Sequence, residues 1–183
     1  MAASCSCGPS CEERPIQVPT SRILARALLL FWALWLSVVS ASNAVDALEG
    51  TGILSPGWRF ASGNFALVAE SLSIYSLPQI WAAVLFSLVL FVELASSALF
   101  WRAALDPNPL SPHAQPRILY PFFVGIGLFC AFLVFDEVLL VYRRFPGLET
   151  THFAVLSALV LSLILIRVLD ERENRNDEVR RLP

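Results

Sequence analysis

The sequence predicts an all-α, polytopic membrane protein with a four-transmembrane-helix bundle and a short amphipathic helix in the first outer loop. Three observations predict this class. Apolar residues make up 56% of the 183 residues and charged residues only 15%, whereas soluble domains are close to half apolar and a quarter charged. The mean hydropathy of the chain is +0.65. Four apolar runs follow one another along the chain, each of about 20 residues, which is enough to cross a hydrocarbon core of roughly 30 Å.

The composition also excludes several classes of protein. The net charge is −2, so the chain lacks the basic field that attracts nucleic acid, and its apolar content excludes a disordered chain. The sequence contains no phosphate-binding glycine loop and no serine nucleophile elbow, so we expect neither enzymatic activity nor a cofactor. The expected partners are the lipid bilayer and either another membrane protein or a second copy of the chain.

Residues 1–21 form a polar head, which we expect to be disordered and cytoplasmic. The head contains Cys5, Cys7 and Cys11. Three thiols this close together could bind Cu(I) or Zn(II), because soft thiolate ligands prefer such ions. No fourth Cys or His lies nearby, and the spacing matches no structural zinc pattern, so the alternative is that these cysteines have no metal-binding role.

The membrane domain is expected to cover residues 22–169. Its apolar runs should be helices, because backbone polar groups in lipid must be hydrogen-bonded within their own segment. The charged cytoplasmic tail, residues 170–183, should extend the last span into solvent. The four expected spans are about 23–45, 80–101, 118–142 and 151–169.

The first apolar run has an alternative interpretation as a cleaved signal peptide. The segment Ala27–Val39 has the length of a signal-peptide core, and Val39-Ser40-Ala41 resembles a small-residue cleavage site. The apolar stretch continues to about Val45, however, and the preceding head is long and contains two glutamates. An uncleaved span is therefore the first interpretation.

The distribution of arginine predicts the orientation of the bundle. All 13 basic residues are arginines, and basic residues are enriched on the cytoplasmic side of membrane proteins. If the N-terminus is inside, three of them fall in outer segments, namely Arg59, Arg143 and Arg144. The other ten fall in inner segments: Arg14, Arg22, Arg26, Arg102, Arg117, Arg167, Arg172, Arg175, Arg180 and Arg181. We therefore expect both termini in the cytoplasm and a multi-pass protein of the cell inner (cytoplasmic) membrane.

The first outer loop, about residues 46–78, contains apolar residues at helical spacing. They fall on one face: Phe65, Val68, Leu72 and Tyr75. Asn64 or Ser62 could cap the N-terminus of this short helix. Its apolar face should lie on the outer membrane surface or on the mouth of the bundle.

A charged side chain within an apolar run marks either function or packing against a partner. Glu93 lies nine residues before Arg102, roughly 13 Å from the inner boundary at a rise of about 1.5 Å per residue. Ser96 and Ser97, one turn later, could satisfy it by hydrogen bonds. We expect the carboxyl group to be protonated, because desolvation disfavours its anion. It would either hydrogen-bond another helix or handle a proton or cation.

Asp136 and Glu137 lie seven residues before Arg143 and Arg144, roughly 10 Å inside the outer boundary. On a continuous helix this spacing aligns Asp136 with Arg143 and Glu137 with Arg144. The two acids point about 100° apart. At most one of them should face the bundle axis, while the other faces a neighbouring helix or subunit.

Further polar residues should gather at the same outer level. Asn43 and Asp46 end the first span, and His152 starts the fourth. Together with Asp136 and Glu137 they could form an outward-facing pocket. Two carboxylates and an imidazole could hold a hard or borderline divalent cation there. The alternatives are a structural cluster that fixes the helix packing and a catalytic site.

These residues support three hypotheses about function. The leading one is an accessory or assembly subunit of unassigned activity, packed through intramembrane polar contacts. The alternative is a small cation- or proton-coupled transporter that uses Glu93, Asp136 and Glu137. The third is soft-metal binding by the cysteines of the head.

Overall fold

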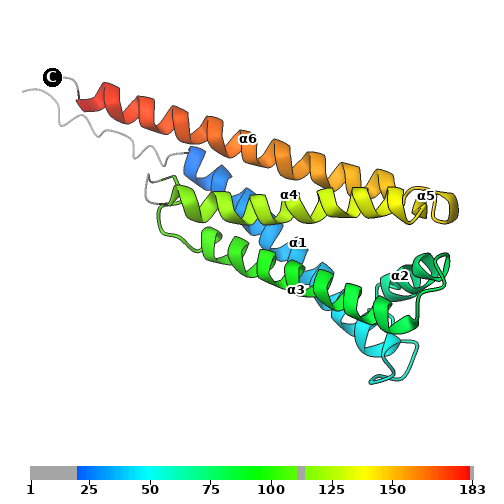
Figure 1. Ribbon diagram of the computed structural model, residues 1–183. Helices are drawn as coiled ribbons and strands as arrows, with labels where there is room; N and C mark the ends of the chain where they lie inside the picture. The colour runs from blue at the N-terminus through cyan, green and yellow to red at the C-terminus, as the bar shows by residue number, and fades with distance from the viewer. Residues whose placement is uncertain (1–19, 111–113, 182–183) are drawn as a thin grey trace, which may run out of the picture.

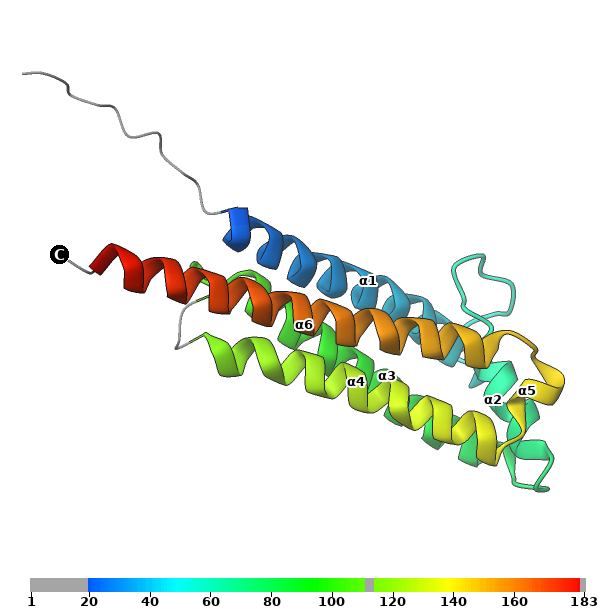
Figure 2. The ribbon, with the colours of Figure 1, turned by 90° about the horizontal axis from the view of Figure 1, so that it is seen from above.

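The computed structural model describes residues 20–110 and 114–181. Helices α1, α3, α4 and α6 are long and apolar enough to cross a membrane, and they run side by side as a bundle (Figures 1 and 2). The predicted all-α class, with four spans and a short helix in the first loop, is confirmed. The helices in chain order are α1 (Thr20–Gly50), α2 (Asn64–Ser73), α3 (Gln79–Ala104), α4 (Gln115–Val138), α5 (Val141–Arg144) and α6 (Leu148–Arg181).

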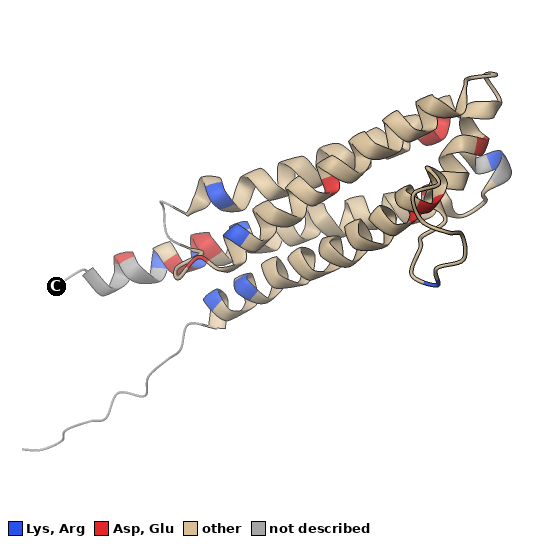
Figure 3. Ribbon diagram, turned by 90° about the horizontal axis from the view of Figure 1, so that it is seen from below, with Lys and Arg blue, Asp and Glu red and all other residues tan. Residues whose placement is uncertain are grey.

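Toward the end of the bundle that carries α2 and α5, the four spans form two pairs, α1 with α3 and α4 with α6 (Figure 1). α1 packs mainly on α3, and α4 packs on both α3 and α6. The start of α1 and the end of α6 lie together at one end of the bundle, the terminal end, and α2 and α5 lie at the opposite, loop-helix end (Figure 1). The separation of α3 and α4 widens toward the loop-helix end in the same view. Charged residues gather near the two ends of the bundle (Figure 3), as expected if the middle lies in lipid.

Aromatic side chains fill the core in the half of the bundle nearer the terminal end. Trp32 of α1 stacks on Phe100 of α3, with ring centroids 6.4 Å apart. Phe100 meets Phe122 of α4 edge to face at 5.0 Å, and Trp32 Nε1 donates a hydrogen bond to Ser162 of α6. Each such ring pair contributes about 0.5–1.5 kcal/mol beyond its buried area. All four spans therefore meet at this aromatic core.

Ion pairs join the helix ends at the terminal end of the bundle. Arg22 of α1 lies 2.9 Å from Glu173 in the extension of α6, and Arg117 of α4 lies 3.0 Å from Asp106 in the preceding loop. Arg26 donates to the carbonyl of Asp106. These arginine side chains are partly exposed, and such pairs contribute only about 0–1 kcal/mol each. They position the helix ends more than they stabilise the fold.

The third span ends earlier than expected. α4 ends at Val138 rather than at about residue 142, because Leu140 adopts a left-handed conformation with a φ of 52° and such a residue cannot continue a right-handed helix. The carbonyl of Val138 accepts a hydrogen bond from the Tyr75 hydroxyl instead. The predicted alignment of Asp136 with Arg143, and of Glu137 with Arg144, is therefore wrong, because no single helix carries all four residues.

Helix α2 is attached to the end of α1 by a carboxylate. Asp46 Oδ2 accepts hydrogen bonds from the backbone N–H of Phe65 at 2.7 Å and from the Ser62 hydroxyl at 2.9 Å. An anion at this position also compensates the positive end of the helix dipole. Of the two expected caps, Asn64 is wrong, because the residue before the helix is Gly63, with a φ of 79°. The Ser62 hydroxyl does contact the start of the helix, since its Oγ accepts a hydrogen bond from the backbone N–H of Asn64 at 3.3 Å.

The contact between Gly50 and Phe65 fixes the docking of α2 on α1. A Cβ atom at Gly50 would lie 2.1 Å from Cδ1 of Phe65. The Phe65 ring is 5% exposed and packs edge to face on Phe86 of α3, with centroids 5.6 Å apart. The ring therefore has no room to move away from a side chain at position 50.

We predict that Gly50→Ala destabilises the protein by about 1–3 kcal/mol, because overpacking forces α2 off its site. Thermal unfolding followed by circular dichroism in detergent measures the change. The matched control is Gly127→Ala, since a Cβ atom there would meet nothing within 4 Å and alanine favours the helix. Equal unfolding midpoints for the two variants would contradict this docking.

Candidate functional site

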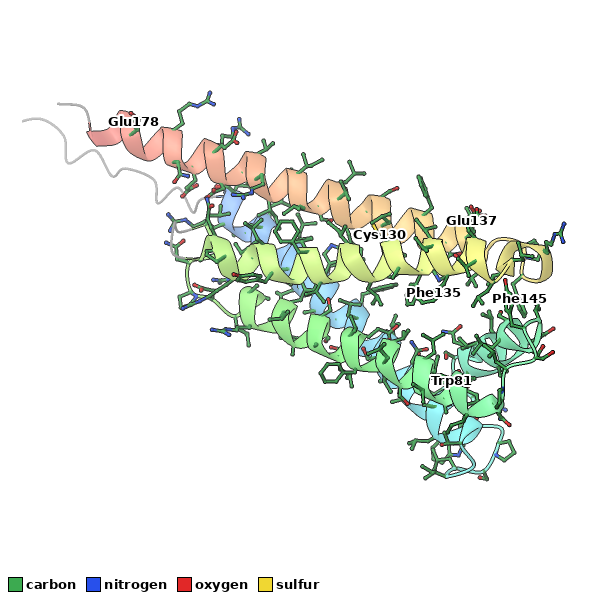
Figure 4. The ribbon with its side chains drawn as sticks, viewed as in Figure 1. Trp81, Cys130, Phe135, Glu137, Phe145 and Glu178 are labelled. Carbon is green, nitrogen blue, oxygen red and sulfur yellow. The ribbon has the colours of Figure 1, made fainter. Side chains whose placement is uncertain are left out.

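The half of the bundle near the loop-helix end contains a cavity of about 280 Å³. It lies between α1 and α3 on one side and α4 and α6 on the other, and residues of α2 and α5 also line it. Phe135 points from α4 toward the side of α2 and α3, and Glu137 points to the opposite side of α4 (Figure 4). The aromatic lining residues are Trp35, Phe86, Phe129, Phe132 and Phe135. The polar lining residues are Asn43, Asn64, Ser71, Glu93, Asp136, Thr151 and His152.

Glu93 on the α3 wall is hydrogen-bonded to Asn43 of α1. Asn43 Nδ2 lies 2.9 Å from Oε1 and 2.8 Å from Oε2 of Glu93, and the two residues are 3% and 4% exposed respectively. Asn43 Oδ1 accepts a hydrogen bond from Asn64 Nδ2 of α2 at 3.0 Å. The second contact fixes which end of the Asn43 amide faces the acid. Side chains from three helices thus form one series of hydrogen bonds, from Asn64 through Asn43 to the Glu93 carboxyl group.

The expectation that Ser96 and Ser97 satisfy Glu93 is wrong. Ser97 lies 2.9 Å from the hydroxyl of Ser37 on α1, and Ser96 makes no hydrogen bond within the described part of the chain. Asn43 comes from a different helix, so the acid contributes to packing between α1 and α3 as well as to the cavity wall. A buried acceptor is stabilised by any donor that the assembled bundle brings near it.

Asp136 and His152 form the second polar group of the cavity. His152 Nδ1 lies 2.6 Å from Asp136 Oδ2, and Asp136 is 3% exposed. The imidazole stacks on Phe132 with centroids 4.9 Å apart, so ring packing and the carboxylate together fix its orientation. Nε2 makes no hydrogen bond to the described residues. This nitrogen is the part of the pair that is available to a ligand or a proton.

The remaining predicted site residues lie outside this cavity. Asp46 caps α2 and does not line the cavity. Glu137 and Arg143 are exposed, and the side chain of Arg144 lies outside the described residues, as do Cys5, Cys7 and Cys11. Within residues 20–110 and 114–181, no three His, Cys, Asp or Glu side chains gather closely enough to hold a metal ion. The expected divalent-cation site is therefore not formed in this part of the chain.

The sequence pattern does not identify two groups of cavity residues. The sequence predicts only a capping role for Asn64, whereas its side chain orients Asn43. The aromatic residues of the lining, such as Trp35, Phe129 and Phe132, resemble any lipid-facing aromatic in a hydropathy pattern. The one signal in the sequence is the Asn64 amide at the start of an otherwise apolar loop helix. A buried amide needs a hydrogen-bond partner when such a helix packs on the bundle.

Fold and site together define a polytopic α-helical membrane protein with a mainly apolar cavity between its helix pairs and a few convergent polar groups. This is the general form of a small-molecule binding site. Comparison with protein-family models, with curated proteins and with solved structures found no match. The cavity and its residues are therefore the features of the molecule that bear on its function.

We predict a coupling free energy of about 1–2 kcal/mol between Asn43 and Glu93 in a double-mutant cycle, in the upper range for interhelical hydrogen bonds in membranes. The variants are Asn43→Leu, Glu93→Leu and the double substitution, and the measurement is reversible unfolding in mixed micelles. Each single change leaves one buried polar group without its partner, and the double change removes both. Asn43→Leu combined with Glu137→Gln is the control and should be additive. Additivity of the Asn43 and Glu93 changes would contradict the contact.

Proposed function

We propose that the protein is a small proton- or cation-coupled transporter, in which Glu93 and the Asp136–His152 pair exchange protons for a solute. The observation that carries this proposal is the cavity lining. Two buried acids, one from each helix pair, line one cavity, and no arginine of the described residues lines it with them. Ionisable groups in such a place are expensive and mark solute or proton pathways by default.

The arrangement of the helices supports movement of a solute. The pairs α1–α3 and α4–α6 meet closely at the aromatic core and form opposite walls of the cavity beyond it. α2 and α5 lie across the loop-helix end of that cavity. Rocking of one helix pair against the other around a fixed site would expose the cavity to one side and then the other, which is the general scheme of alternating access.

The polar contacts within the chain favour this proposal over the packing of a partner subunit. Glu93 and Asp136 have their companions in Asn43 and His152, so neither acid needs a second protein. Glu137, which was expected to take part in transport, lies outside the cavity lining and is left out of the proposed mechanism.

An accessory or assembly subunit is the second candidate function, and Glu137 is the observation that favours it. This acid is exposed on α4 and has no hydrogen-bond partner in the described residues. Cys130 and Gly127, on the same face of the helix, are also exposed, and a Cβ atom at Gly127 would meet nothing within 4 Å. Small residues let a second helix approach closely, and a polar group stabilises such a contact. Soft-metal binding by Cys5, Cys7 and Cys11 stays a prediction about residues outside the described part.

We also propose that the protein lies in the cell inner (cytoplasmic) membrane with both termini in the cytoplasm. The start of α1 and the end of α6 lie at the same end of the bundle, and this end carries most of the arginines. The excess of arginine supports a cytoplasmic location of that end. The cavity then lies in the outer half of the membrane.

The orientation predicts the result of two reporter fusions. A reporter placed after Arg102 should be active only as a cytoplasmic fusion, and one placed after Arg144 only as an external fusion, because α3 and α4 end on opposite sides. Paired reporters with opposite compartment requirements measure this. An external signal from the Arg102 fusion would contradict the proposed orientation.

Transport is tested in proteoliposomes that enclose an acidic buffer and a pH-sensitive dye. Equal potassium on both sides with valinomycin holds the voltage near zero. We expect external sodium or a monovalent organic ammonium ion to raise the internal pH through the protein. Glu93→Gln and Asp136→Asn should each lower the rate at least 10-fold per molecule, because each removes an acid from the cavity.

Glu137→Gln is the matched control, since Glu137 adjoins Asp136 in the sequence but lies outside the cavity, and its rate should equal that of the unmodified protein. Quantification of reconstituted protein separates loss of flux from loss of folded protein. If no cation changes the internal pH, or if Glu93→Gln has the rate of the control, the transport proposal is wrong.

A further inference from the structure

We propose that the solute of this cavity is a lipophilic organic monocation, an ammonium ion that carries an aromatic or branched apolar group. The inference rests on the proposed function and names the substrate class of the same cavity. Three properties of the lining carry it: the sign and number of its charges, the chemistry of its walls, and its volume.

The charges select a cation with a single positive charge. The ionisable lining residues are Glu93, Asp136 and His152, so an anion would find two acids and at most one positive group. The 2.6 Å contact with His152 provides Asp136 with a partner that becomes positive on protonation. Glu93 has only the neutral amide of Asn43 as a donor. One carboxylate is therefore left without a charged partner and matches one positive charge on the solute.

The walls favour an organic cation over a metal ion. Hard divalent cations take six or more oxygen ligands in proteins, and the described residues contain no cluster of three metal-ligating side chains. Both oxygens of Glu93 already accept from Asn43. The five aromatic residues of the lining offer instead the faces and edges of large apolar rings, and ring faces attract ammonium groups electrostatically.

The volume limits the size of the solute. The cavity holds about 280 Å³, close to the lower limit of roughly 300 Å³ for ligand pockets. A single ring with a small quaternary or tertiary ammonium group is of this size, and an extended lipid is too large. Benzyltrimethylammonium has this shape, carries a permanent charge and cannot itself lose a proton.

Binding should exchange one proton for one organic cation. In the empty cavity a proton on Glu93 neutralises the carboxyl group; when the ammonium group arrives, that proton leaves to solvent and the carboxylate pairs with the cation. The balance is one carboxylic acid and one free cation giving one carboxylate–cation pair and one released proton. The net charge in the cavity is therefore the same whether Glu93 carries a proton or pairs with the cation. This equality is the reason that one proton leaves for each cation that binds.

The experiment measures binding to the full chain in lipid nanodiscs by calorimetry, with empty nanodiscs subtracted. Titration of benzyltrimethylammonium in buffers with different ionisation enthalpies counts the released protons. We expect saturable binding with about one proton released. Neopentylbenzene, in which carbon replaces the charged nitrogen, and benzenesulfonate, which carries a negative charge, should each bind at least 10-fold more weakly.

Three variants separate the contributions of the charge and the walls. Glu93→Gln should lower the affinity at least 10-fold and abolish proton release, and Trp35→Leu should lower the affinity while one proton is still released. Glu137→Gln, outside the cavity, should leave both quantities unchanged. If Glu93→Gln does not fold, Glu93→Asp serves instead and should lower the affinity with proton release retained.

The outcomes distinguish this inference from the proposed function. Equal binding of neopentylbenzene, or binding of benzyltrimethylammonium without proton release, would overturn the inference. Failure of benzyltrimethylammonium to bind while sodium collapses the pH gradient in proteoliposomes would also overturn it but leave transport standing. Binding with proton release, when no solute collapses the gradient, would support the substrate class and overturn transport.

Discussion

The hydrogen bond between Asn43 and Glu93 is the contact on which the rest of the structure depends. A carboxyl group in the middle of an apolar bundle is costly unless a donor reaches it. Asn43 supplies that donor to both oxygens, and Asn64 holds the Asn43 amide in the required orientation. The same three residues therefore satisfy the acid, join α1 to α3 and dock α2. The Asn43 amide therefore couples the Glu93 carboxyl group in the cavity to the docking of α2 on the bundle.

The two halves of the bundle have different packing for a related reason. Near the terminal end, Trp32, Phe100 and Phe122 interlock and bring α1, α3 and α4 together. Near the loop-helix end, the polar pairs lie on opposite walls: Glu93 on α3 and Asp136 on α4. Each acid has its hydrogen-bond partner within its own helix pair, so among the described residues no hydrogen bond links the polar group of one wall to that of the other. Close packing in one half and a cavity in the other follow from that division.

Hydropathy predicted the spans because lipid imposes the helical state on every apolar run of sufficient length. It did not predict the end of α4, because Leu139, Leu140 and Val141 are as apolar as the helix before them. The left-handed Leu140 therefore has no signal in composition. The pairing of Asn43 with Glu93, 50 residues apart, depends on the relative rotation and register of α1 and α3, which a single sequence does not determine. Polar residues in spans could be identified as important, but their partners could not.

The attachments of α2 determine which helix pair it would follow in a transport cycle. Asp46 and the Gly50–Phe65 contact hold α2 on α1, and Phe86 of α3 packs on the same Phe65 ring. The Tyr75 hydroxyl, just beyond α2, bonds to the carbonyl of Val138 at the end of α4. A buried carboxylate cap and a close-packed ring are harder to break than one hydrogen bond from an exposed tyrosine. Separation of the helix pairs would therefore break the Tyr75 contact first, and α2 would move with α1 and α3 while the cavity opened along α4.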